Sequence, residues 1–74
     1  MEIEEVWARL KETARDYARE GKRLNRFTAR ALVEDFVQAA QIYPWPRDEV
    51  MEFYSRELRE MTAAHLRTAI RKPA

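Results

Sequence analysis

Apolar residues recur at spacings of three and four along almost the whole chain, and only two breaks interrupt them. The first break is Gly21, and the second is the segment Pro44-Trp45-Pro46. Spacings of three and four place side chains on one face of an α-helix, whereas a strand requires alternation. Glycine favours helix C-termini, and a proline pushes the preceding residue out of the helical region. The pattern therefore predicts three helices and no strand.

The three helices are expected at about residues 2–20, 28–43 and 46–71. Thr28 is expected to cap the second helix while Phe27 packs on Leu32, and Pro46 suits the first position of the third. Short connections favour antiparallel neighbours. The predicted fold class is all-α, a small up-down-up three-helix bundle with a long C-terminal helix, in one domain covering residues 1–74. The core-facing stripes are expected to be Ile3, Trp7, Leu10, Ala14 and Tyr17, then Leu32, Val33, Phe36, Ala40 and Tyr43, then Val50, Tyr54, Leu58, Met61 and His65.

The chain has few ways to add stability beyond helix packing. A chain of 74 residues buries only about 60% of the surface that it exposes when unfolded. Small domains compensate with disulfides, a metal or a partner chain. There is no Cys and only one His, which excludes disulfides and a zinc site. We therefore expect no metal and no cofactor, and we expect association with another chain.

The same composition indicates that the protein is not an enzyme. Without Cys, and with His65 alone, no nucleophile–base pair or metal centre can be assembled. His65 is expected to be a core or interface residue, with a pH-sensitive contact as the alternative. The carboxylates of the third helix alternate with Arg56 and Arg59, which predicts weak pairs on a solvated face rather than a cleft. No small-molecule substrate is expected.

Nothing in the sequence points to a membrane. No apolar run approaches the roughly 20 residues that span a bilayer, and the first residues are acidic without a signal-peptide pattern. A cytoplasmic location is the expectation.

Positive charge is concentrated in two segments of a nearly neutral chain. Residues 19–30 carry five basic groups and one acidic group, and residues 61–74 carry three basic groups and none acidic. In an up-down-up bundle both segments lie at one pole, where they are either a solvated surface matched to helix dipoles or an anion-binding pole. Arg26 and Arg30 favour anion binding, because they flank a helix N-terminus, where cations are unfavourable. The pole would consist of Arg19, Lys22, Arg23, Arg26, Arg30, Arg67, Arg71 and Lys72.

A second apolar side is expected on the third helix. At about 100° per residue, Ala63, Leu66 and Ile70 point away from the predicted stripe, and Phe53 lies at its edge. These four residues form a dimer or partner contact, or else are exposed or covered by the tail. Trp45, held between two prolines, either docks a partner or folds back to cap the bundle.

These features predict a non-enzymatic helical protein–protein interaction module. It would be a small regulator or adaptor that forms a homodimer and binds a larger protein. The alternative is a nucleic-acid-associated protein that uses the basic pole. Phosphate binding weakens steeply as salt rises and apolar docking does not, so salt dependence distinguishes the two functions.

Overall fold

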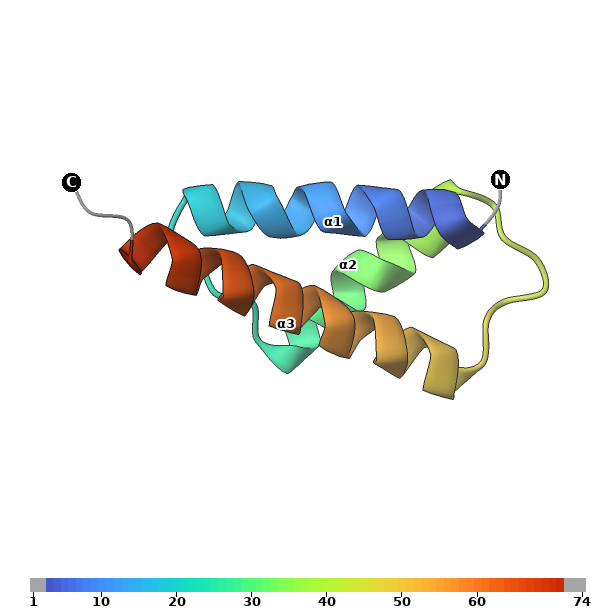
Figure 1. The fold of residues 1–74 in the computed structure, drawn as a ribbon. Helices are drawn as coiled ribbons and strands as arrows, with labels where there is room; N and C mark the ends of the chain where they lie inside the picture. Colours follow the sequence, from blue (N-terminus) through green and yellow to red (C-terminus); the bar gives the residue numbers. More distant parts are fainter. Residues whose placement is uncertain (1–2, 72–74) are drawn as a thin grey trace.

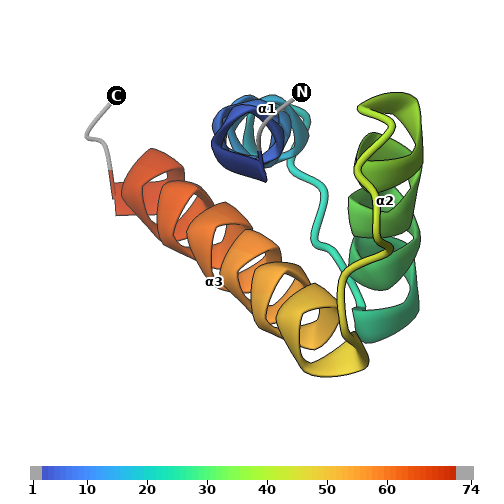
Figure 2. The same cartoon turned by 90° about the vertical axis from the view of Figure 1, so that its right-hand side faces the viewer.

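The computed structural model describes residues 3–71, and the side chains of residues 4–68. It contains helices α1 (Ile3–Arg19), α2 (Arg26–Ala39) and α3 (Asp48–Arg71). Helix α3 has 24 residues, against 17 in α1 and 14 in α2. Helices α1 and α3 run in the same direction and α2 runs back (Figure 1), to one side of that pair (Figure 2). The predicted all-α, up-down-up fold with a long C-terminal helix is confirmed.

Helix α1 ends as the sequence predicts. Gly21 has a φ of 71°, a left-handed conformation that glycine adopts without a steric penalty. The amide of Lys22 donates to the carbonyl of Tyr17 at 2.9 Å, and the amide of Gly21 donates to the carbonyl of Ala18 at 3.0 Å. These two hydrogen bonds satisfy carbonyls that the last helical turn would otherwise leave free. Gly21 thereby turns the chain out of α1.

The start of α2 differs from the prediction. The N-cap is Asn25, whose side-chain oxygen accepts from the amide of Thr28 at 2.8 Å. Asn is at least as good an N-cap as Thr, and it sits where the chain is already extended, at φ −85° and ψ 172°. Thr28 therefore lies inside the first turn. Phe27 is 83% exposed, so the predicted packing of Phe27 on Leu32 is wrong.

Helix α2 also ends earlier than expected. It stops at Ala39, and Gln41 takes a φ of 54° while the amide of Ile42 donates to the carbonyl of Val37 at 3.3 Å. Ile42 then packs against the core, as an apolar residue often does after such a turn. Tyr43 falls outside the helix and is 81% exposed, so its predicted place in the core stripe is wrong.

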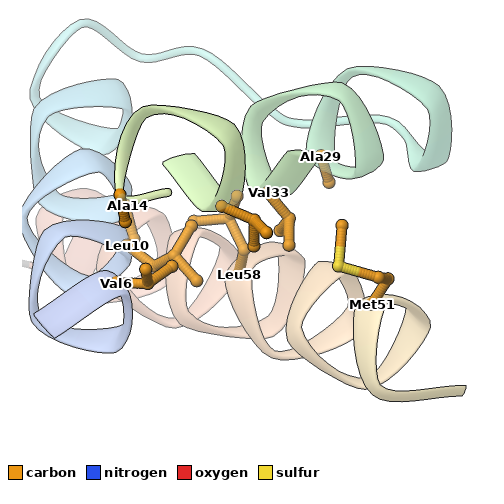
Figure 3. Close-up of a cluster of buried hydrophobic side chains, with 9 residues drawn as sticks. Val6, Leu10, Ala14, Ala29, Val33, Met51 and Leu58 are labelled. Carbon is orange, nitrogen blue, oxygen red and sulfur yellow. The ribbon is translucent and has the colours of Figure 1, made fainter. Parts of the chain in front are cut away.

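The core is a single cluster to which all three helices contribute (Figure 3). It is made of Val6, Leu10 and Ala14 from α1, Ala29, Val33 and Val37 from α2, Ala40 after α2, and Met51 and Leu58 from α3. Trp7 lies at its edge, with its ring centroid 5.4 Å from that of Tyr54. Helix α3 contributes to the cluster along its contacts with both other helices.

The buried row of α3 is rotated from the predicted stripe. It consists of Met51, Ser55, Leu58, Thr62 and Leu66, whereas Val50 is 39% exposed. Ser55 and Thr62 are polar, so a search for apolar spacing passes over them. Thr62 is accommodated because its hydroxyl donates to the carbonyl of Leu58 at 2.8 Å. The rotation turns Leu66 inward.

The three helices do not form a tight parallel bundle. Contacts of α3 with α1 and with α2 are extensive, whereas those between α1 and α2 are sparse. Figure 2 looks nearly along α1 and shows α2 running across it. The extents of the molecule are 47 × 21 × 14 Å, so it is elongated and thin. Across the part of the chain that is described, no helix is both long enough and apolar enough to cross a membrane.

Candidate binding groove along α3

The predicted basic pole does not form as one surface. Arg19 lies 3.6 Å from Asp16, and Lys22 lies 3.4 Å from Glu20. Both pairs are well exposed, and each positive charge lies beside a carboxylate of the same segment. The side chain of Arg71 and the whole of Lys72 lie outside the described residues. The remaining members of the predicted pole divide between two different environments.

Arg30, a member of the predicted anion-binding pole, is surrounded by carboxylates of α2 and α3. Its guanidinium donates to three carboxylates: Glu34 at 3.1 Å, Asp48 at 2.7 Å and Glu52 at 2.5 Å. The hydrogen bond to Asp48, more than any other contact, raises the pKa of Arg30 above its ordinary value. Helix α2 crosses α3 steeply, so its first turns lie against the beginning of α3 rather than its end. Arg30 therefore binds α2 to α3, and its positive charge is already offset by three carboxylates.

Arg23 and Arg67 do come together, across a hollow on the other half of α3. Arg23 belongs to the link between α1 and α2, and this link lies against the second half of α3. The hollow has a volume of about 280 Å³ between Arg23 and Arg67, with Ala63 and Leu66 beneath them. A contiguous hollow of about 200 Å³ adds Leu24, Arg59 and Thr62 to the lining. Arginine side chains thus stand around an apolar floor.

Arg26 lines a larger hollow beside the first half of α3. This hollow, of about 570 Å³, is bounded by Arg26 from α2 and by the outward side of α3. It contains Phe53, whose ring lies 5.9 Å from the guanidinium of Arg56. Arg59 lines both hollows. The end of the larger hollow nearest the start of α3 is acidic, with Asp48, Glu49 and Glu52.

The three neighbouring hollows together are what we call the arginine groove, whose lining includes Arg23, Arg26, Arg56, Arg59 and Arg67. Among the side chains of residues 4–68, none of the five forms an ion pair with a carboxylate. The Nε atom of Arg59 is buried, and the described residues offer it no hydrogen-bond acceptor. A buried donor without an acceptor carries a free-energy penalty. Away from its acidic end, the groove therefore presents arginines without ion-pair partners among the described side chains.

Arg56 and Arg59 are the groove residues that sequence reasoning missed. Their spacing from Glu52, Glu57 and Glu60 predicted weak pairs on a solvated face, yet neither is paired with a carboxylate there. The signal that identifies them is spatial, because it depends on the α1–α2 link lying against α3. No spacing along the chain contains that information.

The predicted dimer-contact residues lie in different environments. Leu66 is only 8% exposed, so the prediction that it points away from the core is wrong. Ala63 is half-buried and Phe53 is 47% exposed, both on α3. Trp45 is 47% exposed and is not part of the core cluster, whereas Ile42 packs against that cluster. The side chain of Ile70 lies outside the described residues.

The described side chains include no group of three or more His, Cys, Asp or Glu that could hold a metal ion. The chain matches no protein-family model, and neither a curated protein nor a solved structure is significantly similar to it. Inference about function therefore starts from the groove and the outer surface of α3.

Proposed function

We propose that the protein is a non-enzymatic interaction module that binds an acidic segment of a larger protein in the arginine groove. The observation that carries this proposal is the set of five arginines without carboxylate partners, one of which has a buried Nε without an acceptor. Hydrogen bonds from a guanidinium to a carboxylate are about twice as strong as neutral ones. As part of this proposal, the module is a cytoplasmic regulator or adaptor.

The floor of the groove favours a peptide over a bare phosphate chain. Ala63, Leu66 and Leu24 present apolar surface between the arginines, and Phe53 lies in the adjoining hollow. An amphipathic acidic helix supplies apolar side chains and carboxylates together.

The acidic end of the groove also favours a peptide over a nucleic-acid backbone. Asp48, Glu49 and Glu52 line it, and a nucleic-acid backbone running along the groove would be repelled there. A peptide accommodates this change of sign by placing a basic residue at that end. Nucleic-acid binding is the alternative function and is an outcome of the test below.

The test is a titration with a labelled helical peptide whose face carries Glu and Leu, with one Lys at the end that meets Asp48, Glu49 and Glu52. A length of about 18 residues gives about 27 Å of helix, which matches the part of α3 that lines the groove. The same peptide with Gln in place of Glu is the peptide control, and an oligonucleotide of equal charge is the competing ligand. Two protein variants accompany them, each with three arginines changed to Gln. The groove variant changes Arg23, Arg59 and Arg67, and the matched control changes the exposed Arg9, Arg15 and Arg47.

We expect the acidic peptide to bind, the Gln peptide to bind at least about tenfold more weakly, and the groove variant to lose at least about tenfold in affinity. The matched control should bind as the unmodified protein does. Preferential binding of the oligonucleotide, with a steep salt dependence, would replace the proposed function with the alternative. Absence of binding by both ligands would overturn it.

A further inference from the structure

The outward side of α3 carries a second pattern, which overlaps the lining of the groove. Six residues spaced four, three, four, three and four apart lie opposite the buried Leu58: Glu49, Phe53, Arg56, Glu60, Ala63 and Arg67. At about 100° per residue, all six fall within about 40° of the direction opposite Leu58. All are exposed except Ala63, which is half-buried. We call them the outer stripe. Their spacing is the one with which two helices pack side by side in a coiled coil.

The outer stripe is symmetric about Leu58. Glu49 and Arg67 lie equally far from it, as do Phe53 and Ala63, and as do Arg56 and Glu60. Every such pair joins complementary partners. Two pairs combine opposite charges, and the remaining pair combines a large side chain with a small one.

We propose that a second copy of this chain docks on the outer stripe, with the two α3 helices antiparallel around a two-fold axis at Leu58. In this arrangement Glu49 of each copy faces Arg67 of the other, and Arg56 faces Glu60. Phe53 packs over Ala63 of the other copy, where the small side chain leaves room for the ring. A two-fold interface requires a surface that is complementary to itself, and the symmetry of the stripe meets that requirement.

Competing alignments bring like charges together, so the stripe specifies its own register. A parallel pair in register sets Glu49 against Glu49 and Arg67 against Arg67. Sliding the antiparallel pair by one heptad in one direction sets Glu49 against Glu60, and in the other direction it sets Arg56 against Arg67. Like charges at a contact discriminate against wrong partners as effectively as attraction favours the right one.

The contact is expected to be weak. Exposed ion pairs contribute little free energy, and Phe53 is the only large apolar side chain in the stripe. All residues of the stripe except Glu60 also line the arginine groove: Glu49, Phe53, Arg56, Ala63 and Arg67. Dimer formation and binding of an acidic segment therefore compete for the same residues.

Sedimentation velocity from about 10 µM to about 1 mM, a range suited to weak contacts, tests the proposal. The unmodified protein should show a concentration-dependent dimer. E49R sets arginine against Arg67, and R67E sets glutamate against Glu49, so each variant alone should be monomeric. Mixed in equal amounts, they should form a heterodimer, because each then offers the charge that the other requires.

Two control variants reverse exposed charges on α1, R9E and E12R, and should dimerise like the unmodified protein. Circular dichroism should show equal helix content for all variants, and recovery in the mixture excludes misfolding as the cause of dissociation. A monomeric unmodified protein, or a mixture that stays monomeric, would overturn the proposed dimer. In either case, binding of the acidic peptide by a monomer would leave the proposed function intact.

Discussion

The guanidinium of Arg30 on α2 donates to the carboxylate of Glu52 on α3, 22 positions further along the chain. Asp48 and Glu34 accept from the same guanidinium. With 22% of its side chain exposed, Arg30 is screened less than an ordinary surface cation. This cluster joins the beginning of α2 to the beginning of α3, where the steep crossing of the two helices brings them together.

Replacing Arg30 with Gln should lower the free energy of unfolding by about 1–2 kcal/mol. The value lies between those of exposed and buried ion pairs, because the carboxylates that remain are partly solvated. Arg26 is a matched control one turn earlier, without an ion pair among the described side chains, and Arg26→Gln should change stability by less than about 0.5 kcal/mol. Urea unfolding of the two variants checks this. Equal stabilities would show that the cluster contributes nothing.

The contribution of the Arg30 guanidinium should not fade at physiological pH. Its folded pKa is raised by the hydrogen bond to Asp48, so its contribution to stability is fully present below the unfolded pKa. It is lost only as the pH rises through the still higher folded pKa. The difference in stability between the unmodified protein and Arg30→Gln should therefore be the same at pH 7 and pH 9 in parallel urea titrations. A difference that shrinks over this interval would contradict the assignment.

Asn25→Ala should destabilise the protein by about 1 kcal/mol, since it removes the acceptor of the Thr28 amide. Thr28→Ala should cost less, because the hydroxyl of Thr28 is not the cap. Thermal unfolding distinguishes them, with an expected fall in Tm of about 4–8 °C for Asn25→Ala. If Thr28→Ala proved the more damaging change, α2 would begin where the sequence pattern placed it.

Two residues with positive φ should respond to substitution in opposite directions. Gly21→Ala should destabilise by about 1 kcal/mol through backbone strain alone, because a Cβ at Gly21 meets no atom within 4 Å. Gln41→Gly should stabilise by about 0.5–1 kcal/mol, since Gln41 already occupies the left-handed region at φ 54°. Denaturant midpoints at a shared m-value measure both effects. Shifts of the same sign would contradict the described helix ends.

Leu66→Ala should lower stability by about 2–3 kcal/mol, at the smaller end of the range for buried leucines. Phe53→Ala should leave folding within about 1 kcal/mol and weaken the proposed dimer. Chemical unfolding combined with sedimentation separates the two effects. A Leu66→Ala protein of normal stability would return Leu66 to the surface position that the sequence predicted.

The number, order and direction of the helices could be predicted because spacing and chain breakers are local properties. Gly21 is the clearest case, since a helix end with positive φ favours the residue that lacks a Cβ. The start of α2 was missed because Asn25 and Thr28 are both good caps three positions apart, and only the extended backbone at Asn25 decides between them.

The arrangement of the groove could not be predicted, because it depends on the angle at which α2 crosses α3. A parallel bundle would have grouped Arg30 with Arg23 and Arg67. The steep crossing instead carries Arg30 to Asp48 and Glu52, and leaves Arg59 beside the α1–α2 link. Leu66 was predicted on the wrong side of α3 because the buried row includes the polar residues Ser55 and Thr62, which a pattern of apolar spacing omits.

The smallest extent of the molecule, 14 Å, affects the rate at which its backbone amide hydrogens exchange with solvent. In a molecule this thin, the hydrogen bonds within each helix protect its amides only while α1 and α2 stay packed against α3. Amides beside Leu10, Val33 and Leu58 should then exchange only through global opening, and all at nearly one rate. Separating α1 or α2 from α3 would expose the same core to solvent, so the whole molecule should unfold together.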